Sequence, residues 1–233
     1  MDLSERTDNI NRHPWELSRT DCLIKKLFKL NIKGRVLDIG CGDAYFDRKL
    51  LETFPDITEL YGVDIYLDKE VHEKRGHWIR NADAIEDKKF DFILIMDVLE
   101  HNEDDLGFLA GLKDYLKEDG VIFITVPAYQ FLFSNHDVVL HHFRRYNHKQ
   151  LASLVRDAQL KAVDWHYFYA SLVPARLLSL KSTKAAGNWQ YSENHIITAA
   201  VRFVLNIDFA VCSLLSKLHI YIFGLSLYMT VRK

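Results

Sequence analysis

The residues best able to do chemistry in this chain are a glycine pair and a series of aspartates placed after short apolar runs. Asp38 lies two positions before Gly40, and Gly42 follows. Glycines there let the backbone approach a ligand at the start of a helix. Three further aspartates follow predicted strands: Asp64, Asp83 and Asp97. Because the carboxyl ends of parallel strands meet at one edge of a sheet, the spacing predicts one crevice lined by acids.

Two classes of cofactor fit this glycine pair. The dinucleotide fingerprint G-x-G-x-x-G requires a third glycine at residue 45, which is Tyr. Asp38 also suits a positively charged ligand better than a pyrophosphate, and S-adenosylmethionine carries a sulfonium, an ammonium and a ribose diol without phosphate. We expect Asp64 to hold the ribose hydroxyls, and Asp83, with Ala84 beside it, to hold the adenine amine.

Alternating apolar runs and helical patterns must position these residues. The predicted strands are Arg35–Ile39, Leu60–Ile65, His77–Arg80, Phe90–Met96 and Val121–Val126, with Lys161–Phe168 and Leu225–Val231 as two further candidates. The predicted helices are Trp15–Leu30, Ala44–Phe54 and Leu106–Leu116. Strands that alternate with helices predict the α/β class, with a doubly wound, mostly parallel sheet.

Composition limits the number of domains, the possible partners and the expected location of the protein. The chain has 233 residues, 48% of them hydrophobic, which suits one globular domain over residues 1–233. The formal charge is -2, so the chain as a whole lacks the excess of positive charge that is typical of nucleic-acid-binding proteins. Three scattered cysteines and a polar stretch at Met1–Pro14 favour a cytoplasmic protein. Residues 1–30 and 170–223 are expected to form a helical cap.

Taken together, these motifs resemble the class I S-adenosylmethionine-dependent methyltransferases, specifically the small-molecule group around the ubiquinone-type enzymes. The matching pieces lie within about residues 30 to 130: Val36–Gly42, Gly62–Asp64, Asp83–Ala84, Phe90–Ile93 and Asp97–His101. The resemblance implies a Rossmann-like seven-stranded sheet with an antiparallel last strand. It also implies that the cofactor lies over Gly40 and Gly42. For Glu100 and His101, a helix start and a position beside the cofactor both stay open.

A second segment, after the fifth strand, has the composition of a binding site. It resembles a run, H-D-x-x-L-x-H-x-R-R-Y, of methyltransferases encoded beside glycan and lipid biosynthesis genes, as do Arg12–Glu16 with Arg19 and Phe223–Leu227. Methyl transfer from a sulfonium needs alignment, and a base if the acceptor is a hydroxyl.

Roles in this segment follow from side-chain chemistry. We expect His136 or His141 to be the base, Arg144 or Arg145 to hold an anionic group, and Tyr129 to contact the acceptor. The alternative is a folded loop in which His136, Asp137 and the arginines form internal salt bridges. No metal site is expected from His136, His141 and His142, because no acidic residue has the spacing that would support one.

The insertion after Ala170 is less informative. Helical projection of His195–Leu215 puts one apolar stripe together: Ile197, Val201, Val204, Val211 and Leu215. We expect this stripe to pack in the core or on a homodimer face. Two other uses stay open: the stripe could contact the inner membrane surface, or it could cover a lipid-like acceptor. Asp208 lies within it and is expected to pair with a basic residue such as Arg176 or to face the substrate. The longest charge-free stretch, Leu218–Val231, is shorter than the ~20 residues of a membrane span, which argues against a transmembrane helix.

The sequence therefore predicts a methyltransferase for a small-molecule or lipid- or glycan-linked acceptor. The run after Asp97 lacks the Pro-Pro-aromatic motif of amino-methylating enzymes that act on nucleobases and protein glutamine, which favours an oxygen acceptor. Two alternatives stay open: an NAD-dependent oxidoreductase, and a non-catalytic binding protein that retains the cofactor fold.

Overall fold

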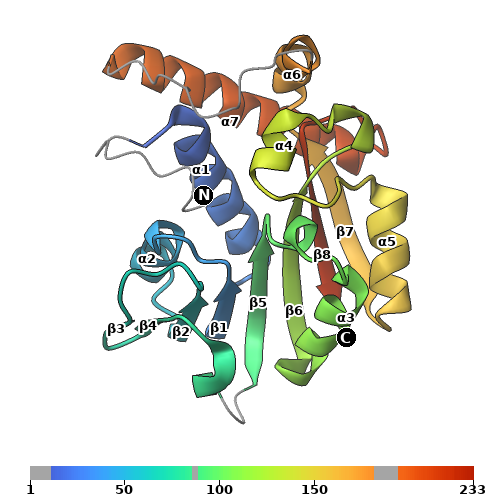
Figure 1. The fold of residues 1–233 in the computed structure, drawn as a ribbon. Coiled ribbons are helices and arrows are strands. Elements are labelled where there is room, and N and C mark those ends of the chain that lie inside the picture. The colour runs from blue at the N-terminus through green and yellow to red at the C-terminus, as the bar shows by residue number, and fades with distance from the viewer. Residues whose placement is uncertain (1–11, 86–88, 181–193) are drawn as a thin grey trace.

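The computed structural model describes residues 12–85, 89–180 and 194–233, arranged around one eight-stranded sheet (Figure 1). The strands are β1 (Gly34–Ile39), β2 (Ile57–Val63), β3 (Val71–His72), β4 (Gly76–Ile79), β5 (Phe90–Met96), β6 (Leu116–Pro127), β7 (Lys161–Phe168) and β8 (Ser226–Arg232). Their order is β3-β4-β2-β1-β5-β6-β8-β7. Each neighbouring pair from β4 to β6 is parallel, whereas β8 runs antiparallel to β6 and β7.

The predicted α/β class, the doubly wound sheet and the antiparallel last strand are confirmed. The eighth strand is β3, which pairs antiparallel with β4 at the sheet edge. It has two residues and is therefore too short to leave a periodic pattern in the sequence.

Helices cover both faces of the sheet. They are α1 (Pro14–Lys29), α2 (Tyr45–Thr53), α3 (Asp105–Gly111), α4 (Asn135–Val139), α5 (His148–Asp157), α6 (Val173–Ser179) and α7 (His195–Lys217). Short 3-10 turns include η2 (Ala82–Ile85), η3 (Leu99–His101), η5 (Gln130–Leu132) and η6 (Ala170–Leu172). Along β5, Phe92 packs with α1 and α7 residues while Ile93 packs with α3 and α5 residues. This alternation explains why the central strand is apolar almost throughout.

The apolar stripe predicted for α7 does not pack in the core of this chain, whereas a homodimer face and membrane contact remain predictions. Leu205, Phe209 and Cys212 are the buried residues of α7. Four residues of the predicted stripe are instead exposed: Ile197, Val201, Val204 and Val211. Because α7 is apolar on several sides, projection alone could not select the packed side.

Two of the three charged residues of α7, Arg202 and Asp208, have described partners in the protein. Arg202 pairs with Asp21 of α1, at 2.6 Å between Nε and Oδ2. Asp208 accepts hydrogen bonds from the backbone N–H groups of Ala170 and Ser171, at 3.1 and 2.6 Å. The expected pair between Asp208 and Arg176 is therefore wrong, because the carboxylate is used to cap the turn at η6.

By length and composition, α7 could cross a membrane, with a mean hydropathy of 1.7 and 22% of its apolar window buried. The sequence-based exclusion considered only charge-free stretches and missed this helix, which carries Arg202 and Asp208. In the structure, α7 packs along α1 and β7 and contributes to the core on that face of the sheet. Length and composition alone therefore do not assign α7 to a membrane span.

Candidate functional site

The glycine loop lies at the carboxyl end of β1 and is tied to the end of β2. Gly40 donates its N–H to the Val63 carbonyl at 2.8 Å, and Gly42 donates to Asp64 Oδ2 at 2.9 Å. Gly40 has φ +76°, and a Cβ there would lie 2.4 Å from Val98 Cγ2. The position therefore requires glycine and presents bare backbone at the crevice.

Asp64 combines two roles at the end of β2. Its Oδ1 accepts from the Tyr66 N–H at 2.9 Å, while Oδ2 holds the glycine loop. The side chain is partly exposed, and a carboxylate has acceptor capacity beyond these two bonds. The geometry therefore fits the predicted contact with a ribose diol. For Asp83 and Ala84 the structure describes the backbone, in η2 after β4, whereas their side chains lie outside the described residues.

Asp38 lies beneath the glycine loop rather than at its surface. It is fully buried beside the equally buried Asp47 of α2, whose Oδ2 accepts from Trp78 Nε1 at 2.9 Å. Burial raises the pKa of Asp47 to about 7 and the pKa of Asp38 well above its ordinary value. The two carboxyl groups therefore retain a proton between them. This position suits support of the loop and not the expected contact with a cofactor.

Asp97 has its charge compensated by a residue of α1. It has φ +56° at the end of β5, and its partly exposed carboxylate forms an ion pair with the buried Arg19. Arg19 also donates to Thr125 Oγ1 at 2.6 Å. Burial raises the pKa of Asp97, but the Arg19 pair outweighs it and holds this pKa below its ordinary value. In the sequence, Arg19 stands only within a subgroup pattern, and its distance from Asp97 along the chain gives no sign of this ion pair.

The start of α1 closes over the glycine loop. Arg12, which precedes α1, pairs with Glu16 of that helix and with Asp43 of the loop. Its guanidinium carbon lies 3.7 Å from the centroid of the Tyr45 ring. Together with Arg19, these contacts place the N-terminal helix at the mouth of the predicted cofactor crevice.

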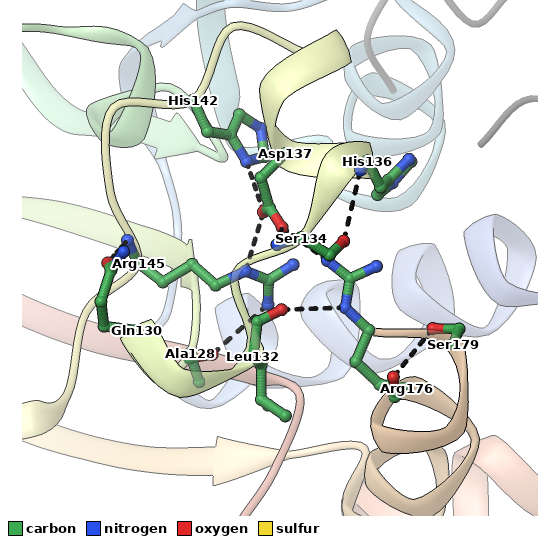
Figure 2. Close-up of polar contacts among 10 residues, drawn as sticks. All are labelled: Ala128, Gln130, Leu132, Ser134, His136, Asp137, His142, Arg145, Arg176 and Ser179. Atoms are coloured by element: carbon green, nitrogen blue, oxygen red, sulfur yellow. Dashed lines mark hydrogen bonds and ion pairs between the residues drawn. The ribbon is translucent and has the colours of Figure 1, made fainter. Parts of the chain in front are cut away.

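On the acceptor side, Asp137 is the centre of a buried polar cluster (Figure 2). It accepts hydrogen bonds from His142 Nδ1 at 2.9 Å, Arg145 Nε at 2.7 Å and Arg176 Nη2 at 2.5 Å. The Ser134 N–H also donates to it, at 2.9 Å. Burial opposes the charge of Asp137, but these donors together hold its pKa below the ordinary range.

Both arginines expected to hold a substrate anion have partners within the protein. Arg145 is 5% exposed and bonded to Asp137. Arg144 pairs with Asp105 at 2.8 Å and donates to the Glu103 carbonyl at 2.8 Å. This arrangement corresponds to the alternative of internal salt bridges, so an acceptor anion would have to displace an existing contact.

The predicted bases occupy different surroundings. His136 is half-buried, and burial, followed by the nearby charge of Arg176, lowers its pKa to about 4. His141 is exposed and has φ +57°. Tyr129, with φ +61°, stacks on Tyr167 at 4.7 Å between ring centroids and lies 5.0 Å from Phe223.

Glu100 is a further residue whose surroundings the sequence did not reveal. It is fully buried in η3, and burial raises its pKa well above the ordinary value. One donor atom each of Glu100, His101 and His142 lie within 4.8 Å of one another. The acceptor segment is also joined to η3 by the Phe143 N–H, which donates to the Glu100 carbonyl at 2.8 Å. A signal existed in the Glu-His pair of the motif, but its distant partner His142 could not be read from spacing.

Comparison with known proteins places this geometry in a family. The methyltransferase domain family matches residues 17–193. The ubiquinone biosynthesis O-methyltransferase of Actinobacillus pleuropneumoniae serotype 5b is 26% identical over 152 residues, which are 56% of this chain and 62% of that protein. The tRNA U34 carboxymethyltransferase of Campylobacter lari is 32% identical over 111 residues, covering 43% and 38%. The chain thus spans less than two thirds of the length of these relatives.

Solved structures share the fold at low identity. An S-adenosylmethionine-dependent methyltransferase from Archaeoglobus fulgidus matches with a TM-score of 0.53 and 19% identity, covering 92% of this chain and 94% of that one. The [4+2]-cyclase SpnF matches with a TM-score of 0.56 and 18% identity, covering 97% and 84%. These matches show the fold alone. The family match covers more than half of the chain, and it shows that this chain belongs to the methyltransferase domain family.

Proposed function

We propose that the protein transfers a methyl group from S-adenosylmethionine to an oxygen of a small-molecule or lipid- or glycan-linked acceptor. The observation that carries the proposal is the family match over residues 17–193, which includes the glycine loop and Asp64. The oxygen target is supported by the relatives named ubiquinone biosynthesis O-methyltransferase. The near balance of charges gives no support to a tRNA acceptor.

The residues at the strand ends have distinct tasks in this proposal. S-adenosylmethionine, when bound, supplies a methyl group on a positively charged sulfur. The backbone of Gly40 and Gly42 lets the cofactor approach, Asp64 accepts from its ribose hydroxyls, and Asp83 accepts from its adenine amine. The Arg19–Asp97 pair fixes α1 over the crevice, which excludes water from the reacting atoms.

The acceptor oxygen gains the methyl carbon as the carbon–sulfur bond breaks, and its hydroxyl proton passes to a base. With a pKa of about 4, His136 is neutral at pH 7 and able to accept a proton, although it is a weak base. His141 lies in solvent at the end of α4 and requires the acceptor itself to cover it. Both remain our proposed bases, with Tyr129 beside the acceptor.

An exposed apolar surface, which we call the α7 face, supports a lipid-linked acceptor. Its exposed residues are Ile196, Phe203, Val204, Ile207 and Leu214, all on α7. Large apolar patches on a protein surface mark contact with another protein or with a membrane. We propose a cytoplasmic enzyme that contacts the inner membrane surface through this face; a homodimer formed through the same face is the competing arrangement.

The test is to follow release of S-adenosylhomocysteine with four acceptors: a small phenol, a lipid-linked phenol, a glycan and a primary amine. We expect turnover with a hydroxyl acceptor and a product methylated on oxygen, identified by mass spectrometry and NMR. Methylation of the amine alone would contradict the oxygen target. Binding of the cofactor without turnover of any acceptor would favour the non-catalytic alternative.

The base is tested separately with His136→Ala and His141→Ala, using His219→Ala as the control. We expect one of the two to lower kcat by about 100-fold. Cofactor affinity should stay unchanged in both, because these histidines lie after β6, in and just after α4, and not in the glycine loop after β1. Full activity in both variants would remove these histidines as the base.

A further inference from the structure

We propose that Glu100, His101 and His142 form a binding site for a zinc-class divalent metal ion. Their donor atoms lie within 4.8 Å of one another, although they come from η3 and from the segment after α4. The Phe143 N–H, bonded to the Glu100 carbonyl at 2.8 Å, holds these two segments together. The site is thus built into the fold rather than assembled from mobile surface side chains.

The strongest support comes from Glu100 itself. Its side chain is 0% exposed, and both carboxylate oxygens lack a hydrogen-bond partner among the described residues. A buried carboxylate without hydrogen bonds is costly unless a counter-charge compensates it. A cation between Glu100 and the two imidazoles would use both the charge and the unused acceptor capacity.

His142 is already oriented as a ligand. Its Nδ1 donates to Asp137 at 2.9 Å, which leaves Nε2 as the nitrogen that can bind a metal. A histidine held by a carboxylate behind it is the usual outer-shell arrangement of metal sites. Asp137 is itself fixed by Arg145 and Arg176 (Figure 2), so His142 has little rotational freedom.

The donor set selects the kind of ion. Two imidazoles and one carboxylate favour zinc-class ions, whereas magnesium prefers oxygen ligands and retains its water. Three protein ligands leave a coordination position open for water or an acceptor oxygen. Because η3 follows Asp97 at the end of β5, the ion would lie at the edge of the proposed cofactor crevice. A role in polarising the acceptor oxygen rests on the proposed function; binding of the ion does not.

The experiment is calorimetric titration of the chelator-treated full chain with ZnCl2 and, separately, MgCl2. We expect one equivalent of Zn²⁺ to bind with a Kd below about 1 μM and Mg²⁺ to bind at least 100-fold more weakly. Glu100→Gln and His142→Ala should each weaken Zn²⁺ binding by at least 100-fold. No binding to the wild-type protein, or equal affinity in these variants, would overturn the proposal.

A control excludes adventitious binding at exposed histidines. His72 and His77 form a surface pair with their Nδ1 atoms 3.3 Å apart, so His72→Ala is the matched control. It should leave Zn²⁺ affinity unchanged, and loss of binding in this variant instead would overturn the proposal.

Two further measurements separate an effect on folding, and the proposed function, from metal binding itself. Glu100→Gln replaces a buried ionisable carboxyl group that has no hydrogen-bond partner among the described residues, so without metal its Tm should equal or exceed that of the wild type. Zn²⁺ should raise the Tm of the wild type and of His72→Ala, and not that of Glu100→Gln; an equal rise in Glu100→Gln would overturn the site. Titration of the same proteins with S-adenosylmethionine tests the proposed function independently, because zinc binding does not require the cofactor.

Discussion

At the scale of single residues, the aspartates that follow the strands occupy different environments and have different uses. Asp64 is partly exposed and reaches the glycine loop, whereas Asp97 is neutralised by Arg19 of a distant helix. Asp38 is buried against Asp47 and does not face the crevice. Their shared position in the sequence pattern predicted one crevice. It could not predict which carboxylate would be buried, because the covering groups come from other segments.

Asp64→Ala should weaken S-adenosylmethionine binding by about 100-fold or more, since hydrogen bonds to a charged acceptor contribute about 1.5–3 kcal/mol each. Asp64→Asn is the matched variant, because its amide oxygen can still accept from Gly42 N–H. It should lose less affinity than the alanine variant. Calorimetric titration measures both, and unchanged affinity in Asp64→Ala would remove this residue from the ribose.

The buried Asp38–Asp47 pair predicts a pH dependence of stability. Since the pKa of Asp47 rises from 3.8 to about 7 in the folded state, the folded protein binds more protons than the unfolded chain between these pH values. The bound proton therefore stabilises the folded protein to its full extent below pH 4, and this stabilisation is lost as the pH rises to about 7. Asp47→Asn avoids this loss, so its stability relative to the wild type should increase by more than about 1 kcal/mol between pH 5 and pH 8.

Urea denaturation at the two pH values measures this difference, with the exposed Asp56→Asn as the control. The stability of the control relative to the wild type should change little between the two pH values, because Asp56→Asn retains the Asp38–Asp47 pair. A parallel decrease in the wild type and in Asp47→Asn would contradict the protonated pair.

At the scale of elements, the acceptor side is held by contacts between segments far apart in the chain. Asp137 of α4 binds Arg176 of α6, and α7 caps η6 through Asp208. The strands were predictable because long apolar runs and β-branched residues need a covered sheet. The contacts of Asp137 with Arg176 and of Asp208 with η6 were not predictable, because the spacing of residues along the sequence does not show which distant segments meet in the fold.

Asp137→Asn should lower the free energy of unfolding by about 3–5 kcal/mol, because it leaves the buried Arg145 and the partly buried Arg176 without their carboxylate. Urea denaturation followed by circular dichroism measures the change. The control is Asp157→Asn on α5, an exposed residue 3.4 Å from Arg156, which should change stability by at most about 0.5 kcal/mol. A loss below about 1 kcal/mol for Asp137→Asn would mean that this cluster does not hold the segments together.

At the scale of the whole molecule, α1 and α7 pack against each other, and α7 also packs against β7 of the sheet (Figure 1). The existence and extent of the long helix were predicted correctly to within a few residues. Its packed side was not, because Leu205 and Phe209 are no more apolar than Ile197 or Val204, and only contact with α1 and β7 distinguishes them. The sequence therefore did not predict which apolar residues of α7 would stay exposed as the α7 face.

If the α7 face contacts a membrane, the double variant Phe203→Ser and Ile207→Ser should reduce binding to phospholipid vesicles by more than about 10-fold. The reason is that each serine has less apolar surface for the membrane to bury than the residue it replaces. Vesicle flotation measures the bound fraction. Leu106→Ser, an exposed apolar position on α3, is the control and should bind like the wild type. A wild-type protein that stays unbound, or a dimer that the double variant dissociates in sedimentation, would assign this face to protein contact instead.

The most direct test of the central claim is parallel calorimetric titration of the full chain with S-adenosylmethionine, S-adenosylhomocysteine and NAD. Because the glycine loop has Tyr45 where a dinucleotide site needs glycine, we predict micromolar binding of the first two and no binding of NAD. Binding of NAD alone would contradict the account and assign the crevice to a dehydrogenase.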